Sequence, residues 1–258
     1  MTVWSNLMRK KHFPNPVPDG FYTGNTTPDP IVGPLENYFG WEWGDALFVV
    51  LDPFWFSKER GGDDNWARML GDEQYQWLRK TLAGSKAKFK FVFLHHLVGG
   101  ADRRARGGIA APKLYEWGGQ NAAGSHDFKQ HRTGWEMPIH QLLVKYKVSA
   151  VFHGHDHLVA KEDRDGIVYQ EVPQPGHPRY GYPRSAAEYG YVSGEIQGSS
   201  GHLRVTVTKD QTKVEDVRSY LPGNEQMAGL LPSVILTLLR HPDNHRLATR
   251  EVVSIRTS

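Results

Sequence analysis

The chain has 258 residues, of which 39% are hydrophobic and 23% are charged, a composition typical of a globular protein. Its formal net charge of +3 and the absence of a long Lys/Arg run argue against nucleic-acid binding, and no apolar run is long enough to cross a membrane or to serve as a signal peptide. The sequence has no cysteine, which excludes disulfides, thiolate zinc sites and cysteine nucleophiles.

The N-terminal part predicts an arm followed by a hairpin. Residues 1–35 are rich in Pro, Gly, Asn and Asp, a composition typical of an extended, irregular segment. Residues 37–52 contain two strand-like runs separated by the turn dipeptide Gly44-Asp45, which predicts a hairpin. The second run is apolar on both faces, so we expect an interior strand of a covered sheet.

The central part alternates helices with strands that end in polar residues. Helical spacing of apolar residues predicts a helix over 72–83, and a strand over 89–96 ends in two histidines. Residues 99–133 show no clear period and predict a long loop. A helix over 136–146 and a short strand at the start of 148–157 follow.

The C-terminal part predicts two more pairs of strands. Residues 158–172 favour a hairpin around Asp165-Gly166, and 202–208 pairs with 213–221. Residues 227–258 begin apolar and end polar, which fits either a helix that covers an exposed surface or sequence foreign to the original gene. We therefore divide the chain into an irregular arm, a central domain and an extension of uncertain origin, at 1–35, 36–222 and 223–258.

Histidines follow two of the apolar strands. His95 and His96 end one strand, and the run His153-Gly154-His155-Asp156-His157 ends another. Strand ends of α/β layers are where binding groups gather, and neutral imidazole is a good ligand for zinc, iron and manganese. In a turn, His155 and His157 can point to one side while Asp156 points away, and we expect Gly154 to supply a backbone conformation that a side chain would forbid. Three imidazoles and an open position would make a hydrolytic metal site.

These two blocks carry a resemblance to a known family. "GHDH" resembles the Gly-His-x-His block of calcineurin-like metallophosphoesterases, which include purple acid phosphatases, and "VFLHH" resembles the block before it. The resemblance extends over roughly residues 10–220 and is closest to a bacterial branch. It implies an α/β fold, the C-terminal part of a two-sheet β-sandwich flanked by helices. The family's earlier blocks, Asp-x-His, Gly-Asp-x-x-[Asp/Tyr] and Gly-Asn-His-[Asp/Glu], are not found in this sequence.

The resemblance implies specific roles for the histidines. His95, His155 and His157 match the family's metal ligands, and His96 would act beside the substrate as a catalytic group. His153 and Asp156 would support the ligands from behind. Because the other ligand blocks are missing, we expect one divalent or trivalent ion (zinc, manganese or iron) and no second ion within one chain.

Arg106 and Arg132 in the long loop are candidate substrate-binding residues, because guanidinium groups bind anions. No family motif assigns them.

The leading functional hypothesis is a metal-dependent ester hydrolase, nominally a phosphomonoesterase or phosphodiesterase acting on a small molecule. One alternative is a carboxylic-ester hydrolase that has lost phosphatase activity. Another is a catalytically inert metal-binding fragment that folds by assembly. A Gly-x-Ser-x-Gly serine hydrolase is disfavoured because that motif is absent.

The missing blocks also bear on assembly and location. A sandwich without its first strands would expose a sheet edge and apolar faces, so we expect a homo-oligomer in which the arm or the tail covers a partner. No signal peptide is visible, so we expect this chain to stay in the cytoplasm as expressed, whereas related full-length proteins can be exported.

Overall fold

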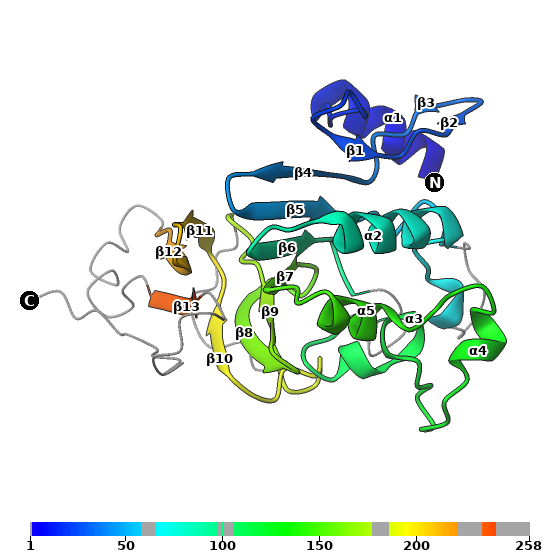
Figure 1. The fold of residues 1–258 in the computed structure, drawn as a ribbon. Coiled ribbons are helices and arrows are strands. Elements are labelled where there is room, and N and C mark those ends of the chain that lie inside the picture. Colours follow the sequence, from blue (N-terminus) through cyan, green and yellow to red (C-terminus); the bar gives the residue numbers. More distant parts are fainter. Residues whose placement is uncertain are drawn as a thin grey trace, which may run out of the picture.

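The computed structural model describes residues 2–57, 65–97, 100, 106–176, 186–220 and 234–240 (Figure 1). The helices are α1 (Thr2–His12), α2 (Asp72–Gly84), α3 (Tyr115–Gly118), α4 (Phe128–His131) and α5 (Ile139–Lys145), with short 3-10 turns η1 (Asn65–Ala67) and η2 (Ala111–Lys113). The strands are β1 (Thr23–Gly24), β2 (Pro28–Asp29), β3 (Gly33–Pro34), β4 (Phe39–Trp43), β5 (Ala46–Val50), β6 (Phe89–Phe93), β7 (Ala150–His153), β8 (Leu158–Arg164), β9 (Ile167–Glu171), β10 (Glu195–Gly198), β11 (Gly201–Val207), β12 (Gln211–Arg218) and β13 (Val234–Arg240).

The described strands form one large sheet and smaller ones. The large sheet has the order β1-β4-β5-β6-β7-β9-β8-β10, and β5, β6, β7 and β9 run parallel to one another at its centre. Val49 of β5 pairs with Val92 of β6, which pairs with Val151 of β7. The carboxyl ends of these strands therefore meet at one edge of the sheet, and their amino ends meet at the opposite edge.

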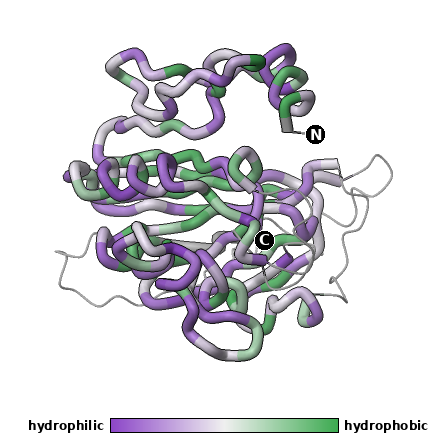
Figure 2. The backbone as a smooth tube through the Cα atoms, turned by 90° about the vertical axis from the view of Figure 1, so that its right-hand side faces the viewer, coloured by the Kyte–Doolittle hydropathy of each residue, from purple (hydrophilic) through white to green (hydrophobic). Residues whose placement is uncertain are grey.

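Successive side chains of the central strands point to opposite faces of the sheet, and apolar side chains are buried on both faces. One face packs against α2 and α5, with Val49, Val92 and Val151 in the same apolar cluster as Leu78 and Leu142. The other face is covered by the small sheet β11-β12-β13, through a cluster whose members are Ala46, Phe89, Phe91, Ala150, Phe152, Val168, Val214, Leu203 and Leu239. Figure 2 shows green, hydrophobic stretches of the tube inside the body of the molecule and purple, hydrophilic stretches along its outside.

Most of the predicted elements are confirmed. The hairpin is β4 and β5, which pair antiparallel around Gly44, and the helix expected at 72–83 is α2. The hairpin around Asp165-Gly166 is β8 and β9, and the last predicted pair is β11 and β12. The helix expected at 136–146 starts later, because Pro138 precedes α5 as its N-cap.

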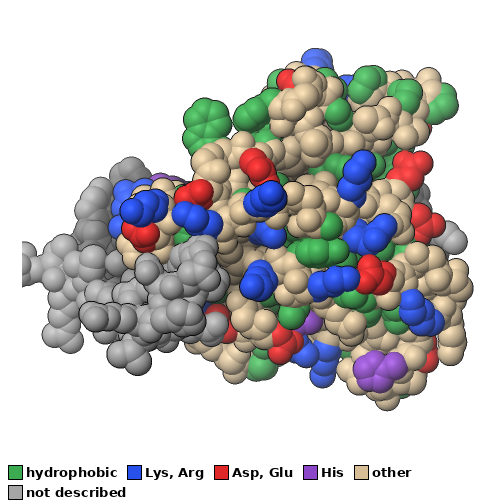
Figure 3. Space-filling model, in the orientation of Figure 1, with side chains coloured by type: hydrophobic (Ala, Val, Ile, Leu, Met, Phe, Trp, Pro, Cys, Tyr) green, Lys and Arg blue, Asp and Glu red, His purple; other side chains and the backbone are tan. Residues whose placement is uncertain are grey.

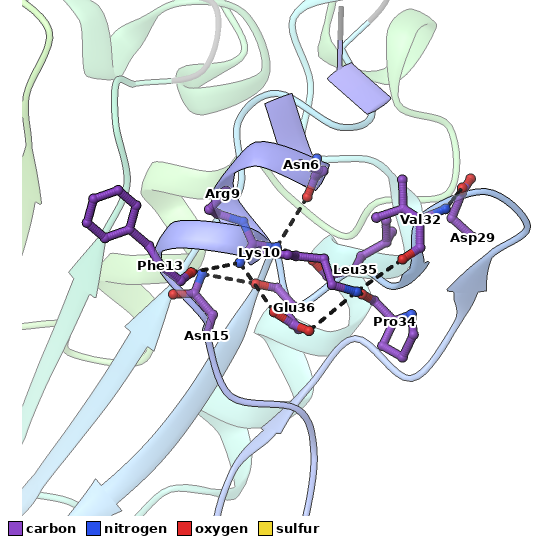
Figure 4. Close-up of polar contacts among 10 residues, drawn as sticks. All are labelled: Asn6, Arg9, Lys10, Phe13, Asn15, Asp29, Val32, Pro34, Leu35 and Glu36. Carbon is purple, nitrogen blue, oxygen red and sulfur yellow. Dashed lines mark hydrogen bonds and ion pairs between the residues drawn. The ribbon is translucent and has the colours of Figure 1, made fainter. Parts of the chain in front are cut away.

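The N-terminal arm is not irregular throughout. Residues 2–12 form α1, which carries Arg9, Lys10, Lys11 and His12 in its last turn, where cations complement the helix dipole. Figure 4 shows how α1 docks onto the segment that follows β3: Arg9 donates to the Leu35 carbonyl oxygen at 2.5 Å and pairs with Glu36 at 3.4 Å. The many Pro and Gly residues after the helix obscured this docking contact in the sequence.

Two further expectations are corrected. The predicted long loop contains the 3-10 turn η2 and the short helices α3 and α4. Each of these elements has buried residues, which hold it against the core. In the tail, 234–240 is a strand paired with β12, so the helix expected there is wrong for these residues. These residues form a strand because they pair antiparallel with β12. A contact with a distant segment cannot be predicted from the local sequence pattern. The other residues of 223–258 lie outside those described.

Large hydrophobic side chains are exposed near the N-terminal end of the described chain. Trp4, Phe13, Ile31 and Trp43 are between 66% and 73% exposed, and hydrophobic side chains are visible in the upper part of Figure 3. None of the described helices has the length and hydropathy of a membrane span. The expected homo-oligomer stays a prediction.

Candidate functional site

The predicted histidines lie at the carboxyl edge of the parallel strands. His95 and His96 follow β6 by two and three residues, and His155 and His157 lie in the turn that follows β7. Gly154 N donates to the His95 carbonyl oxygen at 2.8 Å, which holds the two strand ends together beyond the ladder. Adjacent parallel strands thus place two histidine segments, 60 residues apart in sequence, side by side.

Three imidazole rings cluster at this edge. His95 Nε2 lies 3.1 Å from His155 Nδ1. The ring centroids of His95 and His155 are 5.1 Å apart, and those of His96 and His155 are 5.6 Å apart. Phe54, which follows β5, contacts both His95 and His96 with centroid distances of 5.4 and 5.2 Å. The cluster is therefore built from the ends of three neighbouring strands.

The third predicted ligand is on the same turn but does not complete a metal-binding group. His157 is exposed, and it acts electrostatically on His95. Across the described ranges, no group of three His, Cys, Asp or Glu side chains is arranged to hold a metal ion. The structure thus brings together two of the three predicted ligands, His95 and His155.

The turn that carries the ligands has unusual backbone angles. His155 has φ 95° and His157 has φ 58°, a region that residues with a side chain seldom adopt. Gly154 has no positive φ, and an added Cβ there would meet only the His95 carbonyl oxygen at 3.6 Å. The role expected for Gly154 is therefore wrong, because the strained positions are the histidines themselves. Strain of this kind collects at binding sites.

A buried carboxylate fixes the turn from behind. Glu171, at the end of β9, is fully buried; its Oε2 lies 2.7 Å from His153 Nδ1, and its Oε1 accepts from Asp156 N at 2.9 Å. Burial raises the pKa of Glu171, and the nearby His153 opposes that rise. Glu171 therefore links the strand end at His153 to the backbone of the ligand-bearing turn.

The Asp156 side chain ties the same turn to two loops. Its Oδ2 accepts from Gly107 N at 3.0 Å and from the Tyr191 hydroxyl at 2.8 Å. His153 is buried, 3% exposed. His153 and Asp156 thus both contact structural partners, and the support they would give to metal ligands stays a prediction.

His96 is a neutral imidazole at physiological pH. Its side chain is buried, and burial, followed by the neighbouring His95 and His155, lowers its pKa to about 3. Its Nδ1 atom has no hydrogen-bond partner among the described residues. Burial, followed by the neighbouring His155 and His157, also lowers the pKa of His95. Neutral imidazoles are the form that binds metal ions, since a protonated nitrogen has no free lone pair.

The two predicted arginines have different environments. Arg132 is buried and bonded inside the core: its Nε pairs with Glu116 and its Nη2 donates to the Trp66 carbonyl oxygen at 2.7 Å. The guanidinium is a structural group of the core, so the substrate-binding role expected for Arg132 does not fit its position. Arg106 is partly buried, with its Cζ 3.9 Å from the centre of the Tyr189 ring.

Sequence reasoning missed three residues that shape the site. Phe54 forms an aromatic wall beside the histidines, and Asp52 holds that wall because its Oδ1 accepts from Phe54 N at 2.8 Å. Glu171 is the third. All of them lie at or just past the end of a parallel strand, so the strand-end rule that identified the histidines could have found them. Asp52 and Glu171 end apolar runs, "ALFVVLD" and "GIVYQE", where a lone carboxylate is a usable signal.

The histidine pair fits a metal ion in part. Two nitrogen ligands of a tetrahedral zinc site, with bonds of about 2.0–2.1 Å, are about 3.3 Å apart. The observed separation of 3.1 Å between His95 Nε2 and His155 Nδ1 is that of a hydrogen bond between the two rings, and it is close to this spacing. A complete protein site needs at least one further donor, which the described residues do not place there.

Comparisons with known proteins show a likeness in fold. The chain is similar to the solved structure of PhoD over 93% of its own length and 47% of that structure, with 16% identity and a TM-score of 0.56. It thus spans about half the length of that protein. A weaker likeness is to the purple acid phosphatase PPD1 of yellow lupin (Lupinus luteus), with 15% identity and a TM-score of 0.42 over 71% of this chain and 31% of that one.

No family model matches the sequence, and no curated protein does. The likeness to PhoD therefore concerns the fold, a mixed α/β arrangement with a large sheet and helices. It agrees with the α/β architecture that the sequence implied.

Proposed function

We propose that this chain is a metal-dependent ester hydrolase, nominally a phosphoesterase, whose site is the cluster of His95, His96 and His155. One observation carries the proposal: His95 Nε2 and His155 Nδ1 lie 3.1 Å apart at the carboxyl ends of adjacent parallel strands. The likeness in fold to PhoD, which extends over 93% of this chain, supports the proposal.

His95 and His155 would hold a single zinc, manganese or iron ion, with His157 or a residue of a second copy as a further donor. When bound, such an ion supplies a water acidified to a pKa of roughly 7 and polarises the ester oxygen. Glu171 and Asp156 contribute by keeping the turn at 154–157 in the conformation that presents His155 to His95.

His96 would interact with the substrate as a neutral group. With a pKa of about 3 it is not protonated to the imidazolium at neutral pH, so it cannot act as the general acid for a leaving group. A neutral imidazole has one N–H and one lone-pair nitrogen, so it can still form a hydrogen bond to a substrate oxygen. The ring of Phe54, 48% exposed beside it, offers an apolar surface for an aryl group of the ester.

The proposal predicts hydrolysis that depends on bound metal. Chelation should remove the turnover of an aryl phosphate, and zinc or manganese should restore it, measured by release of the coloured phenol beside the metal content of the same samples. An aryl acetate assayed in parallel separates the two ester classes, because phosphatase activity should exceed acetate hydrolysis. Activity that persists in metal-free protein would contradict the proposal, and metal binding without turnover of either ester would favour the inert metal-binding alternative.

A further inference from the structure

A cavity of about 420 Å³ lies at the edge of the sheet opposite the histidines. Its lining comes from the segments 86–90, 147–149 and 165–167, which lead into β6, β7 and β9. In Figure 1 the arrow of β5 points to the right, so this amino-terminal edge is on the left, near the small sheet. A five-residue strand spans about 17 Å, so β6 separates the cavity from the histidine cluster.

The lining is strongly basic. Four lysines contribute to it, namely Lys86, Lys88, Lys90 and Lys147, against one carboxylate, Asp165. Asp165 is already engaged, with its Oδ2 2.7 Å from His140 Nε2 and 3.5 Å from Arg164 Nε. Lys88 is paired with Asp45 at 3.0 Å. Within the described parts of the chain, Lys86 and Lys147 form no ion pair, so no carboxylate is paired with either of these two charges.

Lys90 reaches into the cavity wall from β6. The residue is only 9% exposed, and its Nζ donates to the Tyr146 carbonyl oxygen at 3.0 Å. Burial, together with the nearby Lys147, lowers its pKa, whereas Glu42 opposes this shift. An ammonium has three N–H donors, and the described residues supply an acceptor for one of them. A buried ammonium with spare donors is a strong point of attraction for an anion.

Part of the cavity lining is apolar. Three apolar side chains also line the cavity: Val144 near the end of α5 and Ile167 at the start of β9 on the helix-covered side of the sheet, and Leu239 of β13 on the opposite side. Ligand pockets of roughly 300–1,000 Å³ usually combine an apolar wall with a few polar groups that fix orientation. The cavity therefore suits a small molecule that has both an anionic and an apolar part.

We propose that this cavity binds a small organophosphate, with its phosphate among Lys86, Lys90 and Lys147 and its apolar group against the apolar part of the lining. This site is separate from the histidine cluster and does not rest on the function proposed for that cluster. A competing explanation is that the lysines only complement helix dipoles, because Lys86 follows the end of α2 and Lys147 follows the end of α5. That explanation predicts no saturable binding.

The test is calorimetric titration of the metal-free full chain with phenylphosphonate, a dianion that cannot be hydrolysed as an ester. The double variant Lys86→Gln/Lys147→Gln should bind at least tenfold more weakly than wild type. A matched control, Lys11→Gln/Lys80→Gln, removes the same charge from exposed positions on α1 and α2 and should bind within twofold of wild type. His155→Ala should also bind within twofold.

Three results would overturn the site. The first is the absence of saturable binding to wild type at physiological ionic strength. The second is an equal loss in both double variants, which would show that net charge alone attracts the anion. The third is a loss in His155→Ala with full binding by Lys86→Gln/Lys147→Gln, which would place the anion at the histidine cluster. The replaced lysines are exposed, so we expect these variants to fold. Circular dichroism of each variant checks this.

Discussion

Replacing His155 by alanine should lower the turnover of an aryl phosphate by about a thousandfold and remove the bound metal. The structure brings only two imidazole nitrogens together, so the variant keeps one of them, His95 Nε2. A bound ion contributes several kcal/mol of transition-state stabilisation, and each ~1.4 kcal/mol is a factor of ten in rate. The measurement is kcat/KM together with the metal content of purified wild type and variant.

A matched control is His126→Ala, which removes an exposed histidine of the long loop. It should keep the activity and metal content of wild type. Full activity in the His155→Ala variant would show that the proposed hydrolysis by a metal-activated water is wrong. Loss of activity with metal content unchanged would place His155 on the substrate rather than on the metal.

Replacing Glu116 by alanine should cost about 3–5 kcal/mol of unfolding free energy, because it leaves the buried charge of Arg132 without its partner. Glu116 is fully buried, and its Oε1 also accepts from Leu70 N at 2.7 Å. Burial raises its pKa to about 7, whereas Arg132 acts to lower it. Denaturant unfolding of wild type and variant measures the difference.

The control is Glu136→Ala, which removes an exposed carboxylate that pairs with Lys145 and Arg79. Its midpoint of unfolding should stay close to wild type, since exposed ion pairs contribute little. The double variant Glu116→Leu/Arg132→Met should recover most of the lost stability, because no buried charge is left unpaired. A Glu116→Ala midpoint equal to wild type would show that the ion pair does not stabilise the fold.

The central strands and the position of the histidines at their carboxyl ends could be predicted from the sequence, because each depends only on local patterns. Apolar runs identify β5, β6 and β7, and polar residues that follow parallel strands meet at one edge. His95 and His155 could therefore be placed together although 60 residues separate them. Their spacing of 3.1 Å and the exposed position of His157 depend on turn geometry, which no periodicity encodes.

The rest depended on contacts between distant segments. Arg132 belongs to the core because Glu116 and the Trp66 carbonyl lie beside it, and the loop containing it shows no period. The strand β13 forms because β12 offers it a partner. The basic cavity combines Lys90 of β6 with lysines from the segments before β6 and β7, and no single lysine indicates such a cavity in the sequence.

The most direct test of the proposed hydrolase is a crystal of the full chain soaked in zinc, with anomalous diffraction data collected at the zinc edge. The proposal predicts one anomalous peak per chain, within about 2.0–2.1 Å of both His95 Nε2 and His155 Nδ1. The same map would identify the further donor, whether His157 or a residue of a second copy. A well-ordered histidine edge with no anomalous peak there, at zinc concentrations that saturate activity, would contradict it.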